Sequence, residues 1–171
     1  APSDGLDIDF SDGNINDLKI YVAGNDGLDL SGSNVNAKNL EIIESNDKGI
    51  SLGEETNFQS KKINIENTKV GIAVKDGSKA KIENLKIKNS EIGIAGFIKK
   101  SEYGDIQLEA IDTSFQNTLE NLLFSKNGKI RVNNKMYIPN SSNKAIYKLI
   151  YKEWKKLKIF MKIIQDMRKN I

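Results

Sequence analysis

Five aspartates near the start of the chain recur at a spacing that brings like charges together. Asp4 and Asp26 are 22 residues apart, as are Asp7 and Asp29, and Asp9 follows Asp7 by two residues. If segments of 22 residues stack as strands, equivalent carboxylates lie about 5 Å apart. They then repel each other unless a cation binds between them or the pKa of one rises. Because the chain has no histidine, we expect these five aspartates to bind calcium, which prefers oxygen ligands.

A structural role competes with the calcium site. Aspartate and asparagine at tight corners accept hydrogen bonds from the turn backbone, and Asn25-Asp26-Gly27 is such a corner. Asn67 and Asn89 are also 22 residues apart, and we expect them to form a buried ladder of amide side chains.

The composition excludes several kinds of chemistry. Without cysteine there is no disulfide, thiolate metal site or cysteine nucleophile, and without histidine there is no Ser-His-Asp triad or histidine-based zinc site. A net charge of +3 is too small to indicate a nucleic-acid binder, and none is expected as a partner. The chain opens with Ala1 rather than methionine, so we expect a piece of a longer protein.

A 22-residue repeat organises the first two thirds of the chain. Each copy starts with glycine followed by an aliphatic residue, and apolar and polar residues then alternate, which indicates short strands with one buried face. The copies leave no room for helices, so each strand must pair with its equivalent in the next copy. The prediction is an all-β solenoid, a right-handed parallel β-helix of five to six coils. The glycines are Gly5, Gly27, Gly49, Gly71 and Gly93, and the aliphatic stack is Leu6, Leu28, Ile50, Ile72 and Ile94.

Three segments carry a family resemblance. Residues 25–33 resemble coils of the right-handed β-helix repeat proteins, the pectate-lyase-like superfamily. Residues 47–54 and 71–78 are similar to β-helix segments attached to bacterial proteins related to the spore-coat protein CotH. The resemblance implies a secreted or cell-envelope bacterial protein. It also implies a face for acidic polysaccharide, with calcium and a lysine or arginine base in the enzymes. No nucleotide-binding motif is present, so kinase activity does not carry over.

The resemblance makes two lysines candidates for the base. Lys48 continues the column of Asp4 and Asp26, and Lys75 continues the column of Asp9. We expect carbohydrate contacts on the same face from Asp29, Lys75, Phe97 and Tyr103, with Phe97 exposed.

The long charged loop near residue 100 is a second candidate site. Lys100 and Tyr103 lie on it, and a tyrosine beside a lysine can act as a general acid. The alternative is a solvated bulge that ends the regular coils.

The repeat decays after residue 100, which suggests three regions. We expect coils over 1–117, terminal strands or a hairpin over 118–140, and a basic amphipathic helix over 141–171. Asn127-Gly128 and Asn133-Asn134 are turn signals of the hairpin type. Residues 144–171 contain nine basic and two acidic residues, a net charge of +7.

Three roles are open for the basic helix. It folds back to cap or pack on the solenoid, associates with copies of itself or with a partner, or lies on an anionic membrane surface.

Two functions are compatible with this organisation. The first is a non-catalytic module that binds carbohydrate or has a structural or interaction role. The second is a calcium-dependent lyase or epimerase acting on acidic polysaccharide with a lysine base. The small number of coils and the position of both arginines, Arg131 and Arg168, outside the regular coils favour the module.

Overall fold

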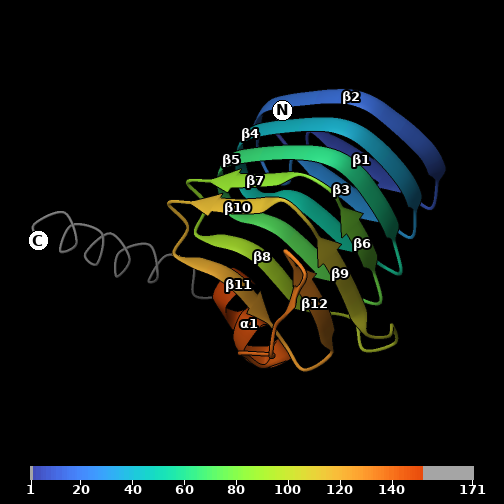
Figure 1. Ribbon diagram of the computed structural model, residues 1–171. Helices are drawn as coiled ribbons and strands as arrows, with labels where there is room; N and C mark the ends of the chain where they lie inside the picture. Colours follow the sequence, from blue (N-terminus) through green and yellow to red (C-terminus); the bar gives the residue numbers. More distant parts are fainter. Residues whose placement is uncertain (1, 152–171) are drawn as a thin grey trace, which may run out of the picture.

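The structure is a computed structural model that describes residues 2–151, which wind into a parallel β-solenoid of about six coils (Figure 1). The predicted fold class is confirmed. Every strand but the last pairs in parallel with its equivalent in the neighbouring coil, and the strands join in one continuous sheet. The elements are β1 (Leu6–Asp9), β2 (Asp12–Ala23), β3 (Leu28–Ser31), β4 (Asn34–Gly53), β5 (Asn57–Lys75), β6 (Lys79–Ile82), β7 (Leu85–Lys88), β8 (Ile92–Phe97), β9 (Ile106–Ala110), β10 (Thr113–Gln116), β11 (Glu120–Phe124), β12 (Gly128–Val132), β13 (Lys135–Met136) and α1 (Asn143–Tyr151).

The coils have three faces, because the long strands β2, β4 and β5 bend around corners. The helix face consists of β1, β3, the ends of β4 and β5, β8 and β11. The groove face consists of the starts of β2, β4 and β5 followed by β6, β9 and β12. The third face consists of the end of β2, the middle of β4 and β5, β7 and β10.

The aliphatic stack predicted from the repeat forms the inner side of the helix face. Leu6, Leu28, Ile50, Ile72 and Ile94 are register partners from one coil to the next, and all but the first are fully buried. Each buried aliphatic side chain contributes about 1.5–3 kcal/mol relative to an exposed one. Similar columns line the other faces, so the interior is one continuous apolar core.

The repeating glycines occur where neighbouring coils come closest. A Cβ atom on Gly49 would lie 2.7 Å from the carbonyl oxygen of Gly71, and one on Gly71 would lie 2.6 Å from that of Gly93. Such distances are shorter than any normal contact. Glycine is therefore required by the close approach of two backbones, which explains the strongest signal in the sequence.

The predicted buried ladder of Asn67 and Asn89 is wrong, because both side chains are exposed. Their φ angles are positive, 57° and 50°. The φ angles are also positive at the equivalent corner of the other coils, at Val22, Glu44 and Asn117. Asparagine tolerates this left-handed conformation better than other residues with a side chain. The backbone of the corner therefore explains the spacing.

The end of the solenoid differs from the expected hairpin at Asn127-Gly128. β11 pairs in parallel with β8 and β12 with β9, so this turn is a corner of a sixth coil. Asn133-Asn134 does form a hairpin, since β12 and β13 are antiparallel and both asparagines have positive φ.

Replacing one stacked glycine by alanine is expected to separate two coils. Gly71→Ala places a methyl group against the Gly93 carbonyl and the Ile87 side chain, and we expect a loss of about 3 kcal/mol in the free energy of unfolding. The measurement is urea unfolding followed by circular dichroism. Gly13→Ala is the control, because no heavy atom lies within 4 Å of that Cβ position. Equal stability of the two variants would contradict the explanation.

Candidate functional site

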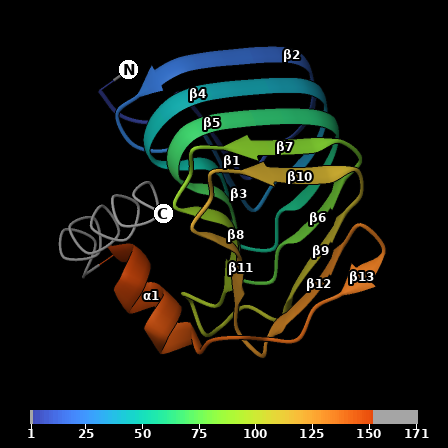
Figure 2. The same ribbon diagram turned by 60° about the vertical axis from the view of Figure 1, so that its left-hand side comes forward.

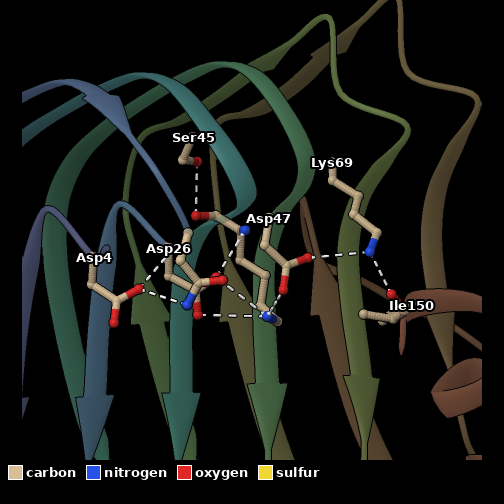
Figure 3. A network of polar contacts seen from close by, with 8 residues as sticks. Asp4, Asp26, Ser45, Asp47, Lys69 and Ile150 are labelled. Carbon is tan, nitrogen blue, oxygen red and sulfur yellow. Dashed lines mark hydrogen bonds and ion pairs between the residues drawn. The ribbon is translucent and has the colours of Figure 1, made fainter. Parts of the chain in front are cut away.

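The predicted column of Asp4, Asp26 and Lys48 forms the centre of a polar network on the edge of the helix face (Figure 3). Asp4 Oδ1 accepts hydrogen bonds from the backbone N–H of Asp26 and from the Asn25 side chain, both at 2.8 Å. One coil further on, Asp26 Oδ1 accepts from the backbone N–H of Lys48 at 3.0 Å. Each aspartate thus bonds to the turn backbone of the next coil, which is the structural role that competed with calcium binding.

Lys48 neutralises this column inside the protein. Its Nζ lies 3.3 Å from Asp26 Oδ1, and both side chains are only 4% exposed. It also donates to Asp47 Oδ2. Burial by itself lowers the pKa of Lys48, but the carboxylates of Asp26 and Asp47 outweigh burial and hold that pKa above its usual value.

Sequence reasoning did not single out Asp47, although it lies 22 residues after Asn25 and 22 before Lys69. The pairing of β4 with β5 shifts register between Ser45 and Lys48, and Asp47 lies in that irregularity. Ser45 Oγ donates to the Lys48 carbonyl at 2.8 Å and holds the irregular turn. The bulge directs the Asp47 carboxylate towards two lysines.

The network continues from the coils to the helix. Asp47 Oδ1 lies 3.4 Å from Lys69 Nζ, which donates to the backbone carbonyl of Ile150 (Figure 3). Lys69 thus supplies a hydrogen-bond donor to a backbone carbonyl of α1. The charged column is therefore a fastening point for α1.

Aromatic side chains cover the same place. The Tyr151 ring lies 5.2 Å from Lys48 Nζ and 5.1 Å from Lys99 Nζ, distances typical of cation–π contacts. Burial raises the pKa of Tyr151 to about 12. Phe97, expected to be exposed, is fully buried in a T-shaped contact with Tyr151, with the ring centroids 6.3 Å apart. The expectation was wrong because the helix covers this column.

The helix packs along the side of the coils beside β8 and β11 (Figure 2). Ile146 and Ile150 are fully buried against an apolar outer surface that includes Val70, Ile92 and Ala95. Residues 152–171, which carry most of the predicted basic helix, lie outside the described residues. No helix within residues 2–151 is long and apolar enough to cross a membrane.

The predicted calcium ligands do not converge. Within residues 2–151, no group of three or more carboxylates is arranged to hold a metal ion. Asp7 and Asp29 are register partners as predicted, and Asp7 and Asp9 are exposed. Partial burial, followed by the charges of Asp9, Asp29 and Asp4, raises the pKa of Asp7. The raised pKa is thus in part a consequence of the repulsion between these carboxylates.

Lys75 lies in the predicted column but is almost completely buried. Its side chain crosses the space above Gly53, where the Cε atom is 3.7 Å from a Cβ position. Burial lowers the pKa of Lys75, although Asp29 opposes this effect. One carboxylate oxygen of Asp29 and the Ser51 hydroxyl are also buried without a hydrogen-bond partner. This amine is therefore electrostatically unfavourable and shielded from large ligands.

Lys100 and Tyr103 are brought together by Glu54, away from the aspartate column. Lys100 forms an ion pair with Glu54, and the Tyr103 hydroxyl donates to the other Glu54 oxygen at 3.5 Å. Asp76 Oδ1 accepts the backbone N–H groups of Lys99 and Lys100 at 2.6 and 2.7 Å. The polar groups of the loop are used to anchor it to the preceding coil.

The groove face carries a basic site that sequence reasoning missed. A groove of about 410 Å³ runs over β5, β6, β9 and β12, and its basic residues are Lys79, Lys81, Lys129 and Arg131. They form two columns: Asp12, Asn34, Asn57, Lys79, Gln107 and Lys129, and Asn14, Asn36, Gln59, Lys81, Glu109 and Arg131. The long loop between β8 and β9 increases the spacing between Lys79 and its register partner Gln107 to 28 residues. The two columns therefore do not follow a constant spacing of 22 residues in the sequence.

Comparison with known proteins gives no match to a family model, a curated protein or a solved structure. The structure itself supports a β-helix repeat protein. The finer family relation stays an expectation.

Breaking the buried ion pair is expected to destabilise the fold strongly. Lys48→Met leaves the Asp26 and Asp47 carboxylates without their shared cation, and we expect a loss of about 3–5 kcal/mol in the free energy of unfolding. In Asp26→Asn/Lys48→Met, the amide still accepts the backbone N–H of residue 48, so we expect recovery of about half the loss. A double-mutant cycle from urea unfolding measures both, and additive effects would contradict the coupling.

Lys75 is expected to make stability depend on pH. The pKa of Lys75 in the folded chain lies below the ordinary value of 10.5. At a pH between these two values the unfolded chain keeps the Lys75 proton and the folded chain has lost it. The free energy of unfolding therefore rises with pH in this range. Lys75→Met is expected to stabilise the protein at pH 7 by about 1–2 kcal/mol and to flatten that rise. Urea unfolding between pH 7 and 10.5 checks this, with exposed Lys79→Met as the unchanged control.

Proposed function

We propose that this chain is a non-catalytic β-helix module of a secreted or cell-envelope bacterial protein, and that its groove face binds an acidic polysaccharide. The observation that carries the proposal is the basic groove over β5, β6, β9 and β12. Lys79, Lys81 and Lys129 make no ion pair with another described residue, while Arg131 lies 3.5 Å from Glu109 with both side chains partly exposed. The cellular location and the relation to pectate-lyase-like or CotH-related proteins rest on the repeat resemblance alone.

The geometry of the groove suits a linear polymer. Lys79 and Lys129 are equivalent residues two coils apart, a separation of about 10 Å along the solenoid axis. Asn57, Gln59 and Gln107 add exposed amides, which both donate and accept hydrogen bonds and so suit sugar hydroxyls. Regularly spaced cations between amides match a chain of sugars with regularly spaced carboxylates.

Binding without turnover fits the candidate catalytic residues. Lys48 and Lys75 are buried, and Lys100 is paired with Glu54, so none offers a free base in the groove. The aromatic side chain in the groove lining, Phe58, is buried, so nucleic-acid bases would have no ring to stack on. These features favour a polysaccharide ligand over a nucleic acid.

Reversing two groove charges is expected to weaken binding to acidic polysaccharide. Lys79→Glu/Lys129→Glu should weaken binding to polygalacturonate by at least about tenfold, and added salt should weaken wild-type binding. Isothermal titration calorimetry measures both. The matched control is Lys126→Glu/Lys144→Glu, which reverses two exposed charges outside the groove lining.

The same calorimetric titrations are carried out with neutral xylan and with single-stranded DNA. Equal binding of xylan, tighter binding of DNA, or equal loss in the two double variants would overturn the proposal. Ultraviolet absorbance of the same mixtures, with and without calcium, should not rise. A rise from unsaturated uronates would make the chain a lyase instead.

A further inference from the structure

A second groove adjoins the basic groove at the corner where the groove face turns into the third face. This corner groove has a volume of about 510 Å³ and is lined by residues 14–16, 36–38 and 59–61 together with Lys81 and Glu83. Gln59 and Lys81 line both grooves, so the two hollows are continuous. The basic groove crosses β6, β9 and β12, which lie side by side (Figure 2), and the corner groove continues it towards the starts of β4 and β2.

Two lysines of the corner groove are stacked on each other. Ala37 and Ser60 are register partners, so the residues that follow them, Lys38 and Lys61, are equivalents in adjacent coils. Their backbones are about 4.8 Å apart, and both side chains are exposed. Like charges at this separation repel each other, as in the aspartate column on the helix face.

No ion pair within residues 2–151 compensates the two lysines. The aspartate column contains Lys48, but Lys38, Lys61 and Lys81 make no ion pair with another described residue. The carboxylate in the corner groove lining, Glu83, lies one coil beyond Lys61 and is not within ion-pair distance of a described lysine. The corner groove therefore has a net positive charge, and an anionic group bound between Lys38 and Lys61 would relieve their repulsion.

The exposed cations of the two grooves form a path along the solenoid axis. The path extends from the sixth coil to the second, so four coil spacings separate its ends, a length of about 19 Å. The fifth coil contributes Gln107 and Glu109 rather than a cation. From the sixth coil to the second, the cations are Lys129, Arg131, Lys79, Lys81, Lys61 and Lys38.

We propose that an acidic polysaccharide bound in the basic groove continues past Gln59 and Lys81 into the corner groove, where its carboxylates bind Lys61 and Lys38. This inference rests on the proposed function, because it extends the same ligand. Asn14 and Asn36 add exposed amides to the corner groove, which suit sugar hydroxyls.

The length of the path defines the ligand more narrowly. A sugar ring in a linear chain is about as long as one coil spacing, so the path from the sixth coil to the second spans about five sugar residues. The ligand is therefore an extended run of uronate residues, because a shorter oligomer reaches the cations of only one groove.

The test compares galacturonate oligomers of three and six residues by isothermal titration calorimetry with the full 171-residue chain. We expect the hexamer to bind at least about tenfold more tightly than the trimer. Lys38→Gln/Lys61→Gln should weaken hexamer binding by at least about fivefold and trimer binding by less than about twofold, because the trimer occupies the basic groove. Lys126→Gln/Lys144→Gln removes two exposed charges outside both groove linings and should bind both oligomers as the wild type does.

Acetylation of lysine side chains, measured by mass spectrometry, then locates the bound oligomer. Protection of Lys38 and Lys61 by the hexamer but not by the trimer supports the proposal, and unprotected lysines in the hexamer complex overturn it. Equal affinity for trimer and hexamer also overturns it, as does unchanged hexamer affinity in Lys38→Gln/Lys61→Gln. In these cases the proposed function stands if Lys79→Glu/Lys129→Glu still weakens binding to polygalacturonate. Absence of polygalacturonate binding by the wild type overturns both proposals.

Discussion

Successive coils lie against one another because glycine stands where the carbonyl of the next coil comes within 2.6–2.7 Å of a Cβ position. This approach holds every coil in register with the next, so each outward residue faces its equivalent one repeat away. Columns of like side chains follow directly. A column of apolar residues inside is favourable, but a column of aspartates outside is costly unless something compensates the charge.

The protein compensates the column of Asp4 and Asp26 in two ways. Both aspartates bond to backbone N–H groups of the following coil, and Lys48 enters the same column. The compensation at Lys48 extends through Asp47 and Lys69 to the end of α1. The lysine that neutralises the stacked aspartates therefore also belongs to the network that contacts the helix. The same helix buries Phe97 and so covers the part of the helix face formed by β8 and β11.

Two exposed surfaces of the solenoid have opposite charge. The groove face is basic where β6, β9 and β12 meet, and the edge of the first coil is acidic. A solenoid separates such surfaces along its axis because each coil contributes its own residues to every column.

The sequence by itself determined the coil length, the inner aliphatic stack and the aspartate columns, because each depends on a repeat that local alternation makes visible. Two columns were predictable for that reason: the aliphatic stack of Leu28, Ile50 and Ile72, and the charged column of Asp4, Asp26 and Lys48. Only the tertiary structure decided which face is covered, since the burial of Phe97 depends on a helix about 50 residues away in the chain. It also placed Asp47 through a register shift, and aligned Lys79 with Lys129 across a loop that breaks the constant spacing.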